Sequence, residues 1–302
     1  MQIVRSPKVM QKICGRLKGE GKIIGFVPTM GYLHKGHLSL IKIAKRKSDV
    51  VVVSIFVNPA QFGPREDFKT YPRDFKRDQL LLEQTGCDFL FAPTRRSMYP
   101  DKYLTYVNVE GLTQHLEGVV RPGHFKGVIT VVAKLFNIVQ PDIAVFGQKD
   151  AQQAVVLKKM VGDLNYGIKM IIAGTVRERD GLASSSRNIY LSKEERKQAK
   201  VLYQALRLAK EMIKKGEKSP SRIVSKMIAL INKQPLADID YVAITDAHSL
   251  ELLNKLKGEI LISLAVKFGK TRLIDNIKMK VSGSLVRDVL LPEPQNNSRA
   301  QA

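Results

Sequence analysis

Two histidines spaced three residues apart, His34 and His37, are the side chains of this sequence best suited to chemistry. They end the stretch 26–37 (FVPTMGYLHKGH), which follows an apolar run typical of a buried strand and precedes an amphipathic run at 38–46. A strand, a glycine-containing turn and a helix in this order place both histidines in the first helical turn, on the same side. Free backbone N–H groups and the helix dipole favour an anion there, and two imidazoles can donate to charge that develops on a phosphoryl oxygen. The motif therefore predicts phosphate binding.

Two other interpretations of these histidines are open: ordinary loop residues, or half of a metal site. Zinc on a helix usually has histidines at i and i+4 with a further carboxylate, and His-x-Gly-His lacks both. The chain has five histidines, and two of them fall in this one four-residue motif. Phosphate binding is therefore the favoured interpretation.

Polar residues also follow three further predicted strands, at 50–57, 141–146 and 168–176. These residues are Asn58 and Gln61, then Lys149, Asp150 and Gln153, and finally Ser185, Ser186 and Arg187. A lone lysine is usually solvated surface, and a serine-rich stretch is usually a linker. However, the loops that follow parallel strands share one edge of a sheet. We therefore expect these side chains and the two histidines to form one site.

The hydrophobic pattern predicts the elements that position these residues. Strand-like and helix-like runs alternate up to residue 176, which predicts an α/β fold with a Rossmann-like, doubly wound parallel sheet. A capping box from Ser192 to Glu195 then opens a long basic helix, and two strand-like runs at 239–244 and 260–268 indicate a smaller C-terminal α+β domain. The expected domains are residues 1–176 and 177–280, followed by a flexible tail at 281–302.

Three finer expectations concern the segments between the main elements. Residues 63–77 are polar and could form a mobile flap. Residues 103–109 alternate between apolar and polar types and are expected to form a further strand. The basic, glycine-rich loop 121–127 is expected to precede a buried helix at 128–139.

Composition limits the classes of protein to which the chain can belong. At 302 residues, with 44% hydrophobic and 26% charged residues, it is long enough for two globular domains. The apolar run at 50–57 is too short to cross a membrane, and residues 1–7 lack the apolar core of a signal peptide. Cys14 and Cys87 lie far apart in no metal-like pattern, which fits a reducing compartment. We expect a cytoplasmic protein without a membrane partner.

The net charge of +22 makes a nucleic-acid partner worth considering. Much of the excess, however, is spread along helix faces, and no RNA-binding aromatic motif, zinc finger or recognition helix accompanies it. A positive cleft for an anionic small molecule is the better interpretation, so no specific nucleic acid is expected.

The same motifs resemble those of the pantothenate synthetase (pantoate–β-alanine ligase) family, within the HxGH nucleotidyltransferase superfamily. The similar segments are residues 28–37, 54–63, 71–74, 121–127, 146–150, 180–188 and 272–276. The resemblance extends in register over residues 1–280. Within it, Phe-Val-Asn-Pro-x-Gln-Phe is far more specific than His-x-Gly-His, which class I aminoacyl-tRNA synthetases share.

The resemblance implies an AMP-forming ligase with two steps. The carboxylate of pantoate attacks the α-phosphorus of ATP to give pantoyl adenylate and pyrophosphate. The amine of β-alanine then attacks the acyl carbon to give pantothenate and AMP. The resemblance also implies Mg²⁺ that arrives with ATP, a homodimer, and a smaller domain that acts as a lid.

Site residues carry over from the family at matching positions. The implied catalytic residues are His37, His34, Lys149, Ser185, Ser186 and Arg187. The implied ATP-binding residues are Met30, Gly31, His34, His37, Gly147, Gln148, Lys149, Asp150, Val176, Ser184, Ser185, Ser186 and Arg187. The implied substrate-binding residues are Asn58, Gln61 and Gln153, with the two glutamines on pantoate, and Asp78 is the positional match for a metal ligand.

Three residues depart from the family pattern: Gln148 stands where glutamate is usual, Ala151 where tyrosine is usual, and Ser184 where methionine is usual. The first change removes a negative charge near Lys149, and the other two alter packing beside ATP. We expect altered affinity rather than lost chemistry.

Two alternatives fit the sequence less well. Another adenylyl- or cytidylyltransferase with His-x-Gly-His would not need the glutamines Gln61 and Gln153. A basic nucleic-acid-binding protein that kept the fold and lost the activity would bind any polynucleotide with steep salt dependence, and it would leave the same glutamines unexplained.

Overall fold

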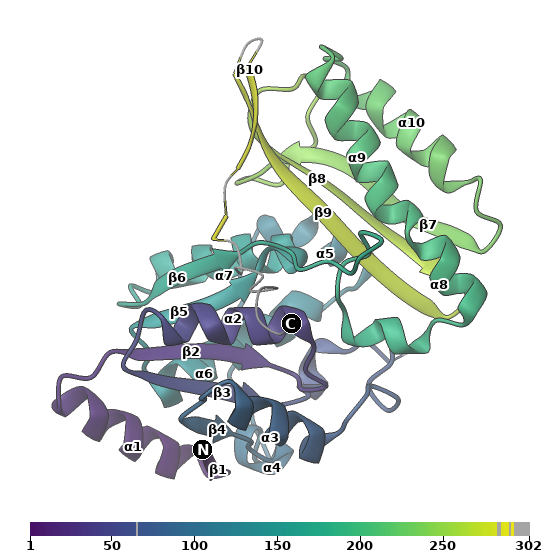
Figure 1. Ribbon diagram of the computed structural model, residues 1–302. Coiled ribbons are helices and arrows are strands. Elements are labelled where there is room, and N and C mark those ends of the chain that lie inside the picture. The colour runs from purple at the N-terminus through teal and green to yellow at the C-terminus, as the bar shows by residue number, and fades with distance from the viewer. Residues whose placement is uncertain (65, 283–284, 290, 293–302) are drawn as a thin grey trace, which may run out of the picture.

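The computed structural model describes residues 1–64, 66–282, 285–289 and 291–292. Its larger part is built on a six-stranded sheet of order β1-β4-β3-β2-β5-β6, in which every pair is parallel (Figure 1). The strands are β1 (Gln2–Val4), β2 (Ile24–Thr29), β3 (Val50–Ile55), β4 (Phe89–Phe91), β5 (Ile143–Gly147) and β6 (Lys169–Ala173). The predicted Rossmann-like parallel sheet is confirmed.

Helices cover both faces of this sheet. On one face α1 (Pro7–Gly19), α6 (His124–Val139) and α7 (Ala151–Asp163) pack in a core that includes Met10, Phe26 and Phe136. On the other face α2 (Lys35–Lys45) and α3 (Phe75–Gln84) pack through residues such as Ile41 and Leu82. Because β2, β3 and β5 are apolar on both sides, they read as continuous hydrophobic runs in the sequence.

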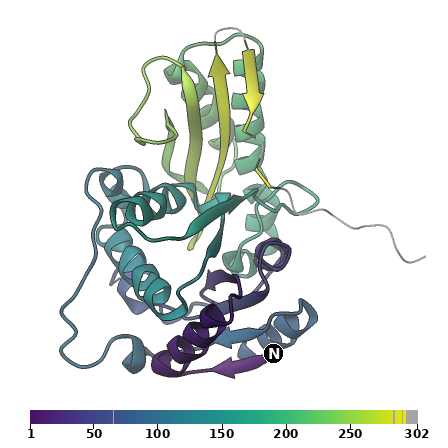
Figure 2. The same cartoon turned by 90° about the vertical axis from the view of Figure 1, so that its left-hand side faces the viewer.

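The smaller part is an antiparallel sheet of order β10-β9-β8-β7, stacked on the carboxyl-end side of the parallel sheet (Figure 2). Its strands are β7 (Ala237–Asp246), β8 (Gly258–Phe268), β9 (Thr271–Ser282) and β10 (Leu285–Asp288). Three helices, α8 (Lys193–Ala199), α9 (Val201–Lys214) and α10 (Pro220–Ile231), accompany this sheet and share a second core with it. The predicted smaller α+β part is confirmed.

Short helical turns complete the chain. They are η1 (Pro59–Gln61), α4 (Arg95–Met98), η2 (Leu112–Gln114), α5 (Glu117–Val120), η3 (Gln148–Asp150) and η4 (Ser186–Tyr190). Among the helices that the structure describes, none has the length and apolar composition needed to cross a membrane.

Several local predictions were wrong. Residues 103–109 form no strand, because they lie over α6 rather than beside another strand, and the Val107 amide donates to Thr130 Oγ1 instead. Helix α6 begins at His124, inside the segment predicted as a loop. The predicted long basic helix is two helices, with Lys200 between them.

The C-terminal residues also differ from the expectation. β9 is the longest strand of the molecule's described part. It was not predicted from the sequence, because charged residues interrupt its apolar ones. Strand β10 lies within the segment expected to be a flexible tail and pairs with β9. Residues 283–284, 290 and 293–302 of that segment lie outside the described residues.

Polar bonds join the two sheets beside the predicted site. The Arg272 guanidinium of β9 donates to both carboxylate oxygens of Glu117, at 2.7 and 2.9 Å, and Glu117 also accepts from the Tyr241 hydroxyl at 2.8 Å. Arg177 pairs with Asp275 at 2.6 and 2.9 Å. Because these ions are largely shielded from water, separation of the two parts would leave buried charges without a partner, which is costly.

Candidate active site

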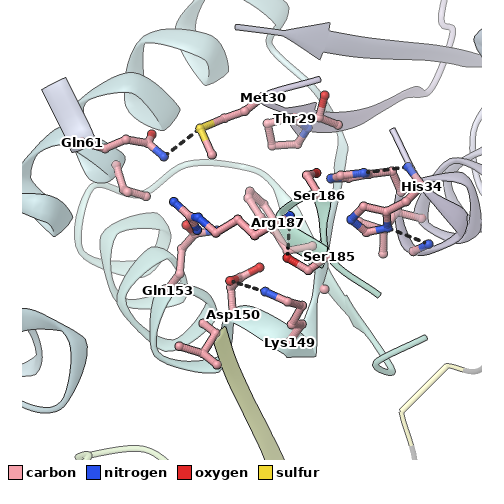
Figure 3. A pocket seen from close by; sticks show the side chains of 18 of the residues that line it. Thr29, Met30, His34, Gln61, Lys149, Asp150, Gln153, Ser185, Ser186 and Arg187 are labelled. Carbon is pink, nitrogen blue, oxygen red and sulfur yellow. Dashed lines mark hydrogen bonds and ion pairs between the residues drawn. The ribbon is translucent and has the colours of Figure 1, made fainter. Parts of the chain in front are cut away.

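A cleft of about 230 Å³ opens where β2, β3, β5 and β6 end and the C-terminal part covers the sheet edge. Most of the predicted site residues line it. They are Met30, His34, His37, Gln61, Gly147, Lys149, Asp150, Gln153, Val176, Ser184, Ser185, Ser186 and Arg187. Figure 3 shows Gln61 and Gln153 on one side of this hollow and His34 on the opposite side, with Arg187 between them. The predicted convergence of the strand-end loops is therefore present.

His34 and His37 form the N-terminal cap of α2. His34 is the N-cap residue, and its Nδ1 accepts from the Gly36 amide at 3.1 Å. His37 Nδ1 accepts from the His34 amide at 3.3 Å, which completes a capping box made of two imidazoles. Since both Nδ1 atoms accept, the proton of each neutral ring is on Nε2, and both rings carry a donor that backbone contacts do not use.

The same two rings are held neutral. Burial, together with the nearby charges of His37, Lys149 and Arg77, lowers the pKa of His34 to about 2. Burial also lowers the pKa of His37 to about 4, and Lys149 adds to this while Asp150 opposes it. The ring centroids are 4.0 Å apart. The site therefore presents two adjacent neutral N–H donors at a helix N-terminus, an arrangement suited to phosphoryl oxygens.

Gly31 and Asp78 hold the turn that leads into this cap. Gly31 has φ of +84°, and an added Cβ would lie 2.9 Å from Ile55 Cγ2 and 3.0 Å from Asp78 Oδ2. The Asp78 carboxylate accepts from the amides of Tyr32 and Leu33 at 2.6 and 2.7 Å. Gly31 and Asp78 do not line the cleft themselves but shape the loop that does.

Asp78 was expected to be a metal ligand, but in the structure it holds the backbone of the histidine turn. Its side chain is buried, and both oxygens are used by the backbone. Burial raises the pKa of Asp78, while the two backbone hydrogen bonds lower it. Within the described part of the chain, no group of three or more His, Cys, Asp or Glu side chains is arranged for a metal.

The loop 184–187 reaches the histidine turn from the far side of the cleft. Ser186 Oγ donates to the Tyr32 carbonyl at 3.1 Å, and Ser185 Oγ accepts from the Arg187 amide at 3.3 Å. The Arg187 guanidinium makes a two-armed ion pair with Asp67, at 2.8 and 2.9 Å. The segment expected to be a mobile flap is therefore attached to the site through Asp67.

Lys149 and Asp150 occupy the floor of the cleft in η3. Lys149 Nζ lies 3.5 Å from Asp150 Oδ1, a looser contact than the arginine pairs around it. Among the described residues that line the main cleft, Asp150 is the single carboxylate. Lys149 is therefore the cation of this cleft least committed to a protein anion.

Gln61 is positioned by its neighbours. Its Nε2 lies 3.0 Å from Met30 Sδ, and its Oε1 accepts from Asn58 Nδ2 at 3.1 Å. Asn58 also donates to the Gly127 carbonyl at 3.1 Å, so this buried residue orients Gln61 instead of lining the cleft. A Cβ on Gly127 would overlap the Ala60 carbonyl oxygen, so only glycine allows α6 to approach the loop this closely.

The three departures from the family pattern have different surroundings. The Gln148 side chain donates to Asn276 Oδ1 at 2.9 Å and points away from the main cleft. Ala151 lines a small side cavity of about 50 Å³ next to Gln153. Ser184 lines the cleft, and its amide donates to the Val176 carbonyl at 2.9 Å.

Other residues of the cleft were not identified from the sequence. They include Thr29, Phe62, Tyr71, Arg121, His124, Arg272 and the α6 valines Val128, Val131 and Val132. The loop 121–127 was singled out for its basic residues, but nothing in the sequence indicated that Arg121 pairs with Glu66 at 2.6 Å. Two signals were available: the family-like segments 71–74, 121–127 and 272–276 contain four of these residues, and helix 128–139 is apolar on most sides, one of which faces the cleft.

Comparisons with known proteins identify the family of the chain. The family model described as pantoate-beta-alanine ligase matches residues 2–278. Pantothenate synthetase of Caldicellulosiruptor bescii is 54% identical over 277 residues, which are 92% of this chain and 98% of that protein. Pantothenate synthetase of Acetivibrio thermocellus is 54% identical over 281 residues, 93% of this chain and 100% of that protein.

Solved structures give the same result. The crystal structure of pantothenate synthetase from Thermus thermophilus has a TM-score of 0.88 and 46% identity, and covers 92% of this chain and 99% of its own. Pantoate-beta-alanine ligase from Francisella tularensis, solved with beta-gamma ATP and beta-alanine, has a TM-score of 0.77 and 37% identity, and covers 91% and 97%. The chain belongs to the pantoate–β-alanine ligase (pantothenate synthetase) family.

Proposed function

We propose that this cleft joins pantoate to β-alanine in two steps through pantoyl adenylate, as an ATP-dependent, AMP-forming ligase. Family membership makes the chain a ligase that forms pantothenate from pantoate and β-alanine with ATP. One observation carries the assignment of the site: two neutral imidazole donors and Lys149 face two glutamines across a single cleft. The cleft thus holds the phosphates of ATP beside the hydroxyl and carboxylate groups of pantoate.

In the first step the pantoate carboxylate attacks the α-phosphorus of ATP, and pyrophosphate leaves. The reaction needs positioning and charge stabilisation, and no enzyme nucleophile. His34 and His37 donate through Nε2 to phosphoryl oxygens, and Lys149 supplies a positive charge beside them. Ser185, Ser186 and Arg187 close over the phosphates, which requires Arg187 to exchange Asp67 for phosphate.

Pantoate fits between Gln61 and Gln153. Their amides can hold its hydroxyl and carboxylate oxygens, because each offers both a donor and an acceptor. The apolar wall of Val128, Val131 and Val132 suits the two methyl groups of this acid. Asn58 is assigned to hold Gln61 in place and not to touch substrate.

In the second step the amine of β-alanine attacks the acyl carbon of the adenylate and AMP leaves. The acyl carbon lies at the junction of the glutamine side and the phosphate side of the cleft, so the amine must arrive there. The flap that carries Glu66 and Asp67 borders this junction through Arg121 and Arg187, and it excludes water that would hydrolyse the adenylate.

Magnesium enters with ATP in this proposal. Asp78 does not fit a metal ion, since both of its oxygens accept backbone hydrogen bonds. Mg²⁺ keeps several waters and binds phosphate oxygens together with one or two carboxylates, and Asp150 is the carboxylate that lines the cleft. Bound there, the ion would neutralise charge on the phosphates.

We further infer that the protein is a homodimer. Segment 103–109 forms no helix or strand and carries Leu104 and Tyr106 with exposures of 85% and 48%, and Val119, nearby in sequence, is 66% exposed. Alternating apolar residues that join no ladder of the described sheets are suited to pairing with a second copy. Buried, unpaired Cys14 and Cys87 fit the reducing cytoplasm, where we place the enzyme.

The test is the release of pyrophosphate and AMP from ATP and Mg²⁺, first with pantoate alone and then with β-alanine added. AMP and pantothenate in equal amounts, formed only with both substrates, are the expected products. Pyrophosphate without amide would point to another amine acceptor, and no ATP turnover at all would contradict the proposal.

A further inference from the structure

The segment after β9 returns to the cleft from outside the part of the chain that the family shares. The family match ends at residue 278. Strand β10 runs antiparallel to β9, with Val286 opposite Val281 and Asp288 opposite Met279, so the chain turns back toward the parallel sheet (Figure 1). Lys210 Nζ of α9 donates to Asp288 at 2.6 Å and fixes the end of this strand.

Residues 291 and 292 then meet the edge of the parallel sheet. β6 is an edge strand, so the backbone at its end is open to a further partner. The Gly174 amide, directly after β6, donates to the Pro292 carbonyl at 3.3 Å. A Cβ on Gly174 would lie 3.9 Å from Leu291 Cβ, so the leucine lies against this backbone.

This contact is made where the nucleotide segments lie. Asp288, Val289 and Leu291 line an open groove together with His34, Val176, Ser184 and Ser185. Gly174, Val176, Ser184 and Ser185 also line the main cleft, so the groove is the outer continuation of the site. Its volume of about 1690 Å³ leaves ample space beside Leu291, so the segment forms a wall of the groove and does not fill it.

We propose that the C-terminal segment 288–292, without residue 290, is a part of the nucleotide site that lies beyond the residues matched by the family model, with Leu291 as an apolar contact for the base and ribose end of ATP. The inference rests on the proposed function, which assigns Val176 and Ser184 to ATP. The phosphates bind at the N-terminus of α2, so the remaining part of the nucleotide extends toward Val176 and this groove. An aliphatic side chain offers the flat face of a purine a surface that excludes water.

Four variants test this placement. Truncation after Asp288 and Leu291→Ala remove the wall. Truncation after Pro292 keeps it and is the matched control for the first, while Arg287→Ala, at an exposed position of β10, is the control for the second. Calorimetric titration with ATP and Mg²⁺ in the absence of pantoate gives the dissociation constant, and steady-state assays give kcat and the KM values.

The two wall variants should weaken ATP binding roughly fivefold, with a parallel rise in the KM for ATP and little change in kcat or in the KM for pantoate. The two controls should match the parent protein. An unchanged dissociation constant in both wall variants overturns the proposal, and so does tighter binding, which would make the segment an obstruction. ATP binding that responds as expected in a protein that forms no pantothenate would instead refute the proposed function alone.

Discussion

Replacement of His37 tests the central feature of the site. His37 Nδ1 accepts from the His34 amide at 3.3 Å, so its remaining N–H group faces the cleft at Nε2. His37→Ala removes this donor, together with one half of the capping box. His37→Gln restores a side-chain N–H donor of similar reach, so the pair separates loss of the donor from loss of bulk.

The expected magnitudes differ for catalysis and stability. Loss of one donor to a developing oxyanion typically lowers kcat by about 10²–10³, or roughly 2.7–4 kcal/mol of transition-state stabilisation. Loss of a helix cap typically costs about 0.5–2 kcal/mol of stability. We therefore expect His37→Ala to fold but to have a kcat that is lower by a factor of about 10² or more. His37→Gln should recover part of this rate.

The assay is pyrophosphate release at saturating ATP and pantoate, measured from pH 5.5 to 8 and paired with thermal denaturation. Because the pKa of His37 is lowered to about 4, the ring is neutral throughout this range, and its contribution to kcat should not change with pH. A rate that increases as the pH falls through the ordinary histidine range would show an imidazolium donor. That result, or a loss of kcat below about tenfold in His37→Ala, would refute the reasoning.

Four further perturbations have defined outcomes. Asn58→Ala frees the Gln61 amide and should raise the KM for pantoate more than the KM for ATP in steady-state assays; equal effects would contradict its positioning role. Asp78→Asn replaces one carboxylate acceptor with an NH2 donor that faces a backbone N–H donor, and it should lower the unfolding free energy by about 1–3 kcal/mol in denaturant titrations, without changing the Mg²⁺ concentration needed for half-maximal activity. Asp67→Asn removes the anion that competes for Arg187 and should tighten ATP binding by roughly fivefold in calorimetry, whereas weaker binding would mean that the pair orders the site. Burial lowers the pKa of His124 to about 4, below its unfolded value, so the unfolded chain binds more protons than the folded chain between about pH 6.5 and 4. The melting temperature should therefore decrease as the pH is lowered through that window, and His124→Gln should make this decrease smaller.

The sequence predicted the parallel sheet because its signals are local. β3 is a continuous β-branched run, and α1 and α10 have serine N-caps followed by proline. A pattern of a few residues therefore predicts each of these elements. The predictions were wrong where a packing or pairing neighbour from elsewhere in the chain determines the local structure. Residues 103–109 have the alternation of a strand, but a strand needs a neighbour to pair with, and α6 occupies that place. β9 carries charged residues because they pair with Asp240, Glu117 and Glu259 from other elements, which no local pattern shows.

The site could be predicted from the sequence to about the same extent as the fold. The predicted residues came from strand-end loops, and most of them line the cleft. Residues one contact behind them have neighbours that the motifs did not indicate: Asn58 supports Gln61, Asp78 supports the histidine turn, and the Gln148 side chain binds Asn276. A motif records that a residue type is required at a position. It does not say whether the ligand or a neighbouring loop requires it.

The charge of the cleft shows the same distinction most clearly. A net charge of +22 suggests a strongly positive site, yet the arginines around the cleft are matched by acids of the chain: Arg187 by Asp67, Arg121 by Glu66, and Arg272 by Glu117. The groups open to phosphate without breaking an arginine ion pair are the loosely paired Lys149 and two neutral imidazoles, and Arg187 joins them only by exchanging Asp67 for phosphate. In the proposed function the lysine and the imidazoles contact ATP, and among these three groups Lys149 carries the full positive charge. Part of the basic surplus, including Lys35, Lys42 and Arg179, lines the outer groove, so the number of basic residues says little about how the main cleft recognises phosphate.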